Sequence, residues 1–460
     1  MSLIGLAFFI VVAIALLSVR REYAPVSLLI GCCYMTTGQG LELGSMSLPM
    51  YRLFLLVGLL RVLMKGETLV GGVNRIDKLV MWLLGWMFFA SFFHEYAPGS
   101  GPVYMLGIIF NISLVYYLVR VWCGTVDEVV GVVVGVGFVL LPVAVEMVFE
   151  QALGKNLFAS LGGIPESVIE RNGRLRAQGP FRHPILAGTV GAACLPLMIG
   201  IWRANRVAAM TGIAACVMMV MASASSGPVV SMMVGLGVVM CWKYRRHAKR
   251  AIWTGLIGYI VIELISNRPA YHVIVTRLDF TGSSTAYYRA RLIDTTVKHF
   301  SEWWLFGTDY TRHWIPEGIG SVVADGKHMD ITNYYIGFGV GAGLLAILLL
   351  LAILRRCLAE VLRHVNDPED DDDHGDRFMI WCLGASLFSH AVSALSIAYF
   401  DQSQTFFWLS VATLSSLLSV RARPEEMDDE DESDSLPESA PAPSAEIHAG
   451  RPWGPVVETR

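Results

Sequence analysis

Two short polar stretches hold the residues of this chain whose types and spacing suit chemistry. Residues 171–184 supply five cationic or titratable side chains: Arg171, Arg174, Arg176, Arg182 and His183. Residues 327–333 supply His328 and Asp330. Arginine presents a planar fork of donors that fits phosphate oxygens in pairs, and an imidazole can take a proton from a hydroxyl near neutral pH. Because both stretches lead directly into apolar segments, they predict a site for an anionic, lipid-borne substrate.

The arginine stretch has the backbone signals of a turn followed by a helix. Gly173, Gly179 and Pro180 favour a turn, and Pro184 suits the first turn of a helix. The amino end of that helix would face the same membrane boundary as the arginines, and its dipole also favours an anion. The alternative for any single arginine is a basic loop that rests on anionic lipid headgroups.

A third polar segment, residues 283–300, is predicted to be an amphipathic helix. Its apolar residues recur at steps of three and four: Ala286, Ala290, Ile293, Val297 and Phe300. Arg289 borders this stripe, while Arg291 has Asp294 at pairing distance. We therefore expect Arg289 to face the ligand, and we keep Arg291 as a further candidate for the same anion.

His328 and Asp330 also have a purely structural interpretation. Asp330 or Thr332 could cap the helix predicted to begin near Asn333. Against this, His328 is expected at the mouth of the helical bundle, on the same side of the membrane as the arginines. This position suits an acid–base role.

The composition describes a membrane protein. Of the 460 residues, 54% are apolar and 16% are charged, whereas a soluble domain carries about 25% charged residues. Hydrocarbon admits only helices and closed barrels, and the apolar runs are too continuous for barrel strands. We expect an all-α, polytopic integral membrane bundle with about 12–13 transmembrane helices. They are predicted at 2–19, 25–44, 48–64, 77–94, 102–122, 127–149, 184–202, 207–223, 227–242, 251–266, 333–354, 378–398 and 404–420.

Lysine and arginine predict the orientation of the bundle in the membrane. They recur at alternate turns, and the positive-inside rule makes that side cytoplasmic. The N-terminus is then outside, the C-terminus is cytoplasmic, and the two larger loops, 150–183 and 267–332, are extracytoplasmic. Residues 151–183 hold five basic and two acidic residues, against this rule. Either long loops cross regardless of charge, or the positive charge binds phosphate.

Residues 1–423 are expected to form the membrane-embedded domain, followed by a disordered tail. The tail, residues 424–460, holds eleven acidic and two basic residues and is rich in Ser, Pro and Ala, a composition typical of disordered segments. None of the eight cysteines falls in the two outer loops, and no metal-ligand spacing is evident. The sequence predicts neither a metal nor another cofactor, and no nucleic-acid partner.

Three segments, taken in order, resemble the O-antigen ligase and O-antigen polymerase superfamily. Residues 176–188 (RAQGPFRHPILAG) resemble its G-x-F-x-H/N-P entry to a central helix. Arg289 followed by residues 304–307 (WLFG) resembles its R…P-L-x-G stretch, and residues 328–343 resemble its H-N-x-Y…G-x-x-G motif. The resemblance covers about residues 170–350. The chain departs from the pattern at residues 225–228 (SSGP), where family members often carry Ser-Arg-Gly, at Trp304, where proline is usual, and in the separation of His328 from Asn333.

The resemblance implies a metal-independent membrane glycosyltransferase at the bacterial inner membrane. Such enzymes pass a glycan from a polyprenyl diphosphate donor to a hydroxyl on a glycan, on lipid A–core or on a protein. By this resemblance, Arg176 or Arg182 and Arg289 would bind the diphosphate, and His328 would orient or deprotonate the acceptor. The sugar, the acceptor, and ligase versus polymerase activity stay open.

Two other function classes stay open beside this one. A transporter or flippase for an anionic lipid or polysaccharide would share the arginines. It would also need a path lined by the ionisable residues inside the predicted helices, which are Arg52, Glu146, Glu263 and His390. A non-catalytic scaffold for envelope polysaccharide assembly would keep the fold and the donor site without the chemistry.

Overall fold

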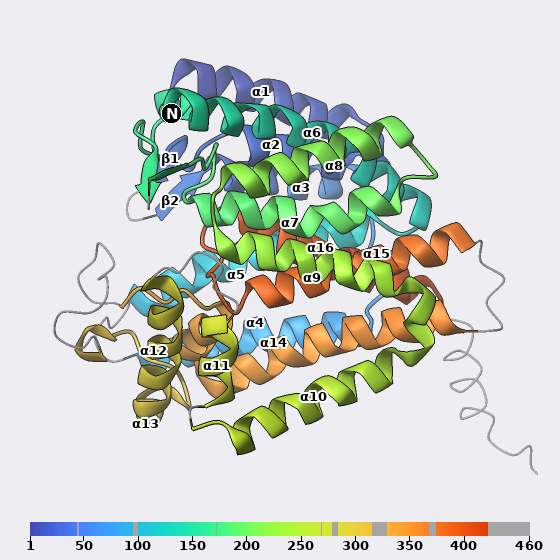
Figure 1. Ribbon diagram of the computed structural model, residues 1–460. Coiled ribbons are helices and arrows are strands. Elements are labelled where there is room, and N and C mark those ends of the chain that lie inside the picture. The colour runs from blue at the N-terminus through green and yellow to red at the C-terminus, as the bar shows by residue number, and fades with distance from the viewer. Residues whose placement is uncertain are drawn as a thin grey trace, which may run out of the picture. The chain divides into compact units, whose positions relative to one another are not determined.

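Helices make up nearly all of the regular structure in the computed structural model (Figure 1). The structure describes residues 1–43, 46–94, 100–171, 173–267, 269–277, 284–314, 329–367 and 374–421. Contacts group Met1–Val420 into one unit. The predicted all-α class is confirmed for the described residues, which add only short hairpins to the helices.

The helices follow the chain in this order: α1 (Leu3–Ser18), α2 (Ala24–Tyr34), α3 (Met50–Lys65), α4 (Arg75–Ala90), α5 (Ser100–Trp122), α6 (Val126–Leu153), α7 (Pro184–Gly200), α8 (Arg206–Ala222), α9 (Ser226–Met240), α10 (Ala248–Ile265), α11 (Ala270–Arg277), α12 (Ser284–Lys298), α13 (Phe300–Trp303), α14 (Tyr334–Asn366), α15 (His374–Ser393) and α16 (Ser403–Arg421). Short 3₁₀ turns are η1 (Arg21–Tyr23), η2 (Ser91–Phe93), η3 (Leu157–Leu161), η4 (Cys241–His247) and η5 (Arg312–Trp314). Two antiparallel hairpins pair β1 (Gly40–Leu43) with β2 (Met46–Pro49), and β3 (Ile169–Arg171) with β4 (Arg174–Arg176).

Most predicted helices are present within a few residues of their expected ends. The prediction of a helix at 25–44 was wrong in its second half. Helix α2 ends at Tyr34, and the polar stretch after it leads into the β1–β2 hairpin. The helix predicted at 333–354 continues to Asn366. Both errors in helix length fall at polar segments, and neither affects the order of the elements.

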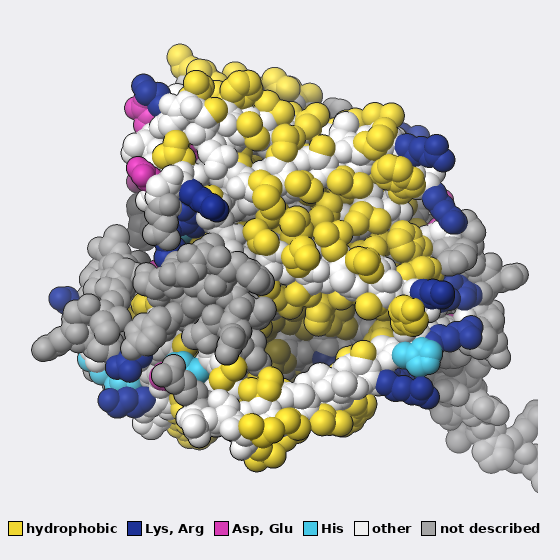
Figure 2. Space-filling model, in the orientation of Figure 1, with side chains coloured by type: hydrophobic (Ala, Val, Ile, Leu, Met, Phe, Trp, Pro, Cys, Tyr) yellow, Lys and Arg dark blue, Asp and Glu magenta, His cyan; other side chains and the backbone are white. Residues whose placement is uncertain are grey.

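Several helices are long and apolar enough to cross a membrane. Five such spans lie in the described residues: Arg75–Phe93, Gly101–Trp122, Val126–Leu153, Ser226–Ile265 and Tyr334–Asn366. Apolar side chains cover the helix flanks, while Lys and Arg gather at the two helix ends (Figure 2). Because apolar flanks on this scale require a hydrocarbon environment, the protein is membrane-embedded.

Helix α7 lies at the centre of the packing. Nearly all its residues from Pro184 to Met198 are buried, against α8, α9 and α15. Glycines allow these close contacts: a Cβ on Gly191 would lie 2.8 Å from the backbone oxygen of Cys216. Small residues are the usual means of close helix packing in membranes. The N-terminus of this buried helix is the end at which the arginine stretch enters the fold.

Helix α14 is kinked at Ala342 and Gly343, where the backbone leaves helical geometry. The loop after α13 fills the break, since Thr308 N–H donates to Val340 O (2.7 Å) and Leu344 N–H donates to Trp304 O (2.8 Å). A Cβ on Gly343 would clash with Leu305 O. The WLFG stretch and the glycine-rich helix, named separately in the sequence, are therefore in direct contact.

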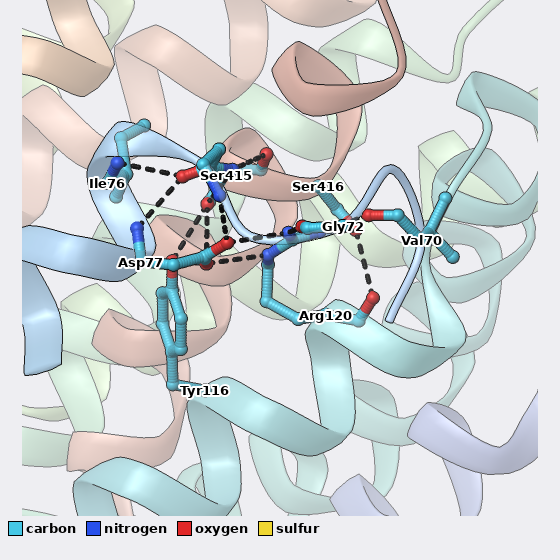
Figure 3. A network of polar contacts seen from close by, with 9 residues as sticks. Val70, Gly72, Ile76, Asp77, Tyr116, Arg120, Ser415 and Ser416 are labelled. Atoms are coloured by element: carbon cyan, nitrogen blue, oxygen red, sulfur yellow. Dashed lines mark hydrogen bonds and ion pairs between the residues drawn. The ribbon is translucent and has the colours of Figure 1, made fainter. Parts of the chain in front are cut away.

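A buried ion pair connects three helices at the opposite end of the bundle (Figure 3). Arg120, on α5, is fully buried and binds both carboxylate oxygens of Asp77, on α4, at 2.8 Å. Its other donors reach Val70 O, Gly72 O and the Ser416 hydroxyl of α16. All five guanidinium N–H groups are thus used. Arg120 therefore holds these helices together.

Candidate anion-binding site

The arginine stretch begins in the β3–β4 hairpin. Its turn contains Gly173 at φ 72°, a left-handed conformation that glycine adopts without strain. The register pairs Arg171 with Arg174 and Ile169 with Arg176, which puts all three arginines on one face of the hairpin. Asn-Gly in the sequence is the usual hairpin signal, and it would have predicted these strands.

The segment after β4 is held by backbone hydrogen bonds to neighbouring helices. Ala177 N–H donates to Ala222 O at the end of α8 (3.0 Å). Gln178 and Gly179 donate their N–H groups to the buried carboxylate of Glu150 on α6, at 2.7–3.1 Å. Glu146, on the same helix, accepts Leu157 N–H (3.1 Å). These contacts fix Arg176 against the start of α9.

Arg176 is buried and lies between the hairpin and the turn that joins α8 to α9. Its Nη2 donates to Ser225 Oγ (2.7 Å) and its Nε donates to Ser223 O (3.4 Å). Burial, together with the positive charges of Arg171 and Arg289, lowers the pKa of Arg176 to about 10. The group stays charged at neutral pH, and the guanidinium groups of Arg171 and Arg289 each repel it.

Arg289 reaches the same place from α12. A Cβ built on Gly227, in the first turn of α9, would lie 3.7 Å from Arg289 Nη2 and 3.2 Å from Ser396 Oγ. Gly227 therefore leaves open the space beside the guanidinium. The expectation that Arg176 and Arg289 share one location agrees with this geometry.

The N-terminus of α9 adds a partial positive charge to this location. Ser225 precedes the helix without capping it through its side chain, because its hydroxyl donates to Ser223 O (2.7 Å). The preceding residue, Ala224, has φ 43°, a strained conformation for a residue with a Cβ. The turn thus holds α9 so that N–H groups of its first turn can donate hydrogen bonds to an anion.

His183 caps the N-terminus of α7, and the positive charges of Arg176 and Arg171 act on it. Its Nδ1 accepts the N–H of Ile185 (3.2 Å), so the neutral tautomer carries its proton on Nε2. Burial, then the charges of Arg176 and Arg171, lower the pKa of His183 to about 4. The imidazole is neutral near pH 7 and can donate a hydrogen bond. We call Arg171, Arg176, His183 and Arg289, with the α9 N-terminus, the arginine site.

Three other predicted ligands are not part of the arginine site. Arg174 lies on the same face of the hairpin as Arg171, but its side chain is exposed. The backbone N–H of Arg182 donates to Asp401, a buried carboxylate before α16 (2.9 Å), and the Arg182 charge acts on that same group. Arg291 acts electrostatically on Asp294, as its spacing predicted. No contact in the described structure joins Arg182 or Arg291 to the arginine site.

The second polar stretch is described only from Met329 onward, so His328 lies outside the described residues. Tyr288, next to Arg289 on α12, donates its hydroxyl to the backbone oxygen of Asp330 (2.5 Å). Met329 N–H donates to Thr311 Oγ1 (2.8 Å). The expected cap was wrong: Asn333, rather than Asp330 or Thr332, accepts Ile336 N–H (3.1 Å) at the start of α14. Asp330, two residues after His328, therefore adjoins the helix that carries Arg289.

The ionisable residues within helices bind separate local partners. Arg52 donates to Asn111 Oδ1 (2.8 Å), and Glu263 accepts Ala270 N–H (2.6 Å). His390 Nδ1 contacts the Tyr399 hydroxyl (2.8 Å). These contacts give each group a structural role, and they assign none of them to a shared transport path.

Three features of this end of the molecule were missed in the sequence. Asp401 has no motif, and the SSGP stretch gave no signal that Ser225 would contact Arg176, because both residues make their contacts with distant segments. His299, Glu302 and His313 form a cluster whose ligand atoms lie within 4.8 Å of one another. The spacing of His299 and Glu302, three residues apart across a helix start, was the one available signal for the cluster.

Comparison with known proteins leaves the fold and the site as the basis for interpretation. No protein-family model matches the chain, and no curated protein matches it significantly.

Proposed function

We propose that this protein transfers a glycan from a polyprenyl diphosphate carrier to a hydroxyl acceptor at the outer face of the bacterial inner membrane, as O-antigen ligases and polymerases do. The observation that carries the proposal is the proximity of Arg176 and Arg289 at the α9 N-terminus, with the charge of Arg171 acting on Arg176. Like charges held together in a partly buried site favour an anionic ligand. A diphosphate at the end of a lipid chain fits a positive site at the boundary of a membrane-embedded bundle.

The arginines would act on the leaving group. The acceptor hydroxyl attacks the anomeric carbon, the bond from that carbon to the phosphate oxygen breaks, and the polyprenyl diphosphate leaves with the added negative charge. Arg176 and Arg289 stabilise that charge, and the neutral His183 adds a donor. His328 takes the proton of the acceptor hydroxyl, and Asp330 holds that segment.

The proposed arrangement in the membrane has about 12–13 transmembrane helices, with the N-terminus outside and the C-terminal tail in the cytoplasm. The arginine site is then extracytoplasmic. A hollow in the surface between α10 and the rest of the bundle (Figure 2) supports a lateral route for a lipid-linked donor. The acceptor is a glycan, lipid A–core or a protein hydroxyl.

The test is glycan transfer by purified protein in liposomes, with a polyprenyl diphosphate oligosaccharide as donor and release of the polyprenyl diphosphate as readout. Arg289→Ala is expected to reduce turnover by about 10²–10³-fold, the usual cost of one charge-stabilising donor. His328→Ala is expected to cost about 10²–10⁴-fold. Arg203→Ala removes an exposed arginine beyond the other end of α7 and serves as the control.

Each outcome points to one function class. Wild-type turnover in both Arg289→Ala and His328→Ala would refute the proposed site. Donor binding without turnover by the wild type would indicate a non-catalytic assembly protein. Movement of the donor across the bilayer without glycan transfer would indicate a flippase.

A further inference from the structure

A second group of polar side chains lies apart from the arginine site, around α13 and η5. His299 precedes α13, Glu302 lies within it, and His313 lies in η5. Histidine side chains gather at the end of the molecule where α13 lies (Figures 1 and 2). None of these three residues has a part in the proposed transfer reaction.

Glu302 is the centre of the group. One carboxylate oxygen contacts His299 Nδ1 at 2.6 Å, and the other contacts His313 Nε2 at 2.8 Å. The Trp314 indole donates to the second oxygen (2.8 Å), while its ring stacks on His299 with centroids 5.2 Å apart. These contacts orient the carboxylate.

These three side chains have the composition of a transition-metal site. Two imidazoles and one carboxylate are the protein ligands of many open zinc sites. With metal–ligand distances of about 2.0–2.1 Å, tetrahedral ligand atoms lie about 3.3 Å apart. The contacts from Glu302 to His299 (2.6 Å) and to His313 (2.8 Å) would therefore lengthen by about 0.5–0.7 Å to admit the ion. The indole of Trp314 would supply the outer hydrogen bond that holds a ligating carboxylate in place.

The cluster opens onto a cavity of about 560 Å³. Glu302 and His313 line this cavity together with His94, Asp309 and Tyr310. The ring of Tyr310 stacks on that of His313, with centroids 5.4 Å apart. An ion held by the three ligands would therefore have a coordination position directed to a polar space large enough for water or a small anionic ligand.

We propose that His299, Glu302 and His313 bind a divalent transition-metal ion of the Zn²⁺ type, with an open coordination position at the cavity. The ion joins the start of α13 to η5 and so closes the loop between them. The loop includes the WLFG stretch that packs into the kink of α14. The proposal is independent of the glycan-transfer reaction.

The experiment measures metal binding by the full-length protein in detergent, purified through a tag without histidine. After treatment with a chelator and buffer exchange, ZnCl₂ is titrated by calorimetry, and CoCl₂ is titrated by visible absorption, which reports tetrahedral coordination. The wild type is expected to bind one ion with a dissociation constant in the micromolar range or below. His313→Gln, which changes the most exposed ligand, is expected to lose this binding.

Two further variants make the result specific. Trp314→Phe keeps the ring but removes the indole donor, and it is expected to weaken binding by about 10–100-fold. His272→Gln is the matched control, because His272 also contacts a carboxylate, Asp294 (2.9 Å), outside the cluster. Glu302→Gln replaces His313→Gln should the latter not fold, as judged by circular dichroism without metal. A wild type that binds no Zn²⁺, or variants that bind it unchanged, overturns the proposal.

Discussion

At the scale of single residues, the arginine site depends on side chains whose charge states are set by their surroundings. Arg176 stays protonated although burial and two neighbouring guanidinium groups disfavour its charge. His183 is neutral for the same two reasons. A bound anion would offset the positive charges that lower the pKa values of Arg176 and His183, and so would raise both values. The site therefore couples ligand binding to protonation of His183.

His183 predicts a pH dependence of stability. Its pKa is about 4 in the folded protein and 6.5 as the ordinary value, so the unfolded chain binds more protons between these values. Stability should be complete above about pH 6.5 and decrease as the pH falls toward 4, by at most about 1.4 kcal/mol per pH unit. His183→Asn keeps an acceptor for the helix cap and should flatten this decrease.

The measurement is thermal unfolding of both proteins in detergent between pH 4 and pH 7.5. Because the carboxylates titrate equally in both proteins, the comparison isolates His183. An unchanged difference in melting temperature across this range would show that His183 is not buried as a neutral group.

At the scale of elements, kinks and buried pairs decide how the helices meet. The α14 kink is filled by the loop after α13, and Arg120 connects α4, α5 and α16 through Asp77 and Ser416 (Figure 3). In a low-dielectric interior, a satisfied ion pair adds little over apolar packing, but removal of one partner leaves a buried charge. Such pairs therefore specify which helices become neighbours.

Asp77→Asn should destabilise the bundle strongly, because it leaves the fully buried Arg120 without its counter-charge. The expected loss is about 3–5 kcal/mol, measured as unfolding free energy in mixed micelles. Asp127→Asn changes an exposed acid in the first turn of α6 and is the matched control. The double variant with Arg120→Met should lose less than the sum of the two single changes. Strict additivity would contradict the coupling.

At the scale of the whole molecule, apolar surface and charge locate the chain in a membrane. Helix α10 has no buried residues in the described structure, and its exposed apolar side chains suit contact with lipid. The arginine site lies at the end where α7, α9 and α16 begin. The basic segment η4 lies at the other end, where Arg245 Nε donates to Val365 O (3.1 Å). In the proposed arrangement, the two ends face opposite sides of the bilayer.

Cysteine labelling tests which end of the bundle faces the cytoplasm. Cys241, at the start of η4, is exposed, whereas the other seven cysteines are buried. The proposed orientation puts Cys241 in the cytoplasm, so a membrane-impermeant maleimide should label inside-out vesicles and leave intact spheroplasts unlabelled. Cys241→Ser should abolish the signal. Labelling of intact spheroplasts would reverse the orientation and would put the arginine site in the cytoplasm.

The sequence by itself determined the helical class, the order of the helices and the segments rich in arginine. These features are local or periodic, and hydrocarbon leaves the backbone few alternatives. Gly173 and Pro184 likewise gave correct local structure, because turn and helix-start geometry depend on neighbouring residues. The same local reasoning failed at residues 36–43, where a hairpin replaces the end of a predicted helix.

Only the tertiary structure decided which arginines share a site. Arg176 and Arg182 lie six residues apart, yet one meets Arg289 at α9 and the other lies beside Asp401. Ser225 and the cluster of His299, Glu302 and His313 were likewise brought together by packing. Such contacts depend on how buried helices approach one another in space, and this information is absent from the spacing of residues along a chain.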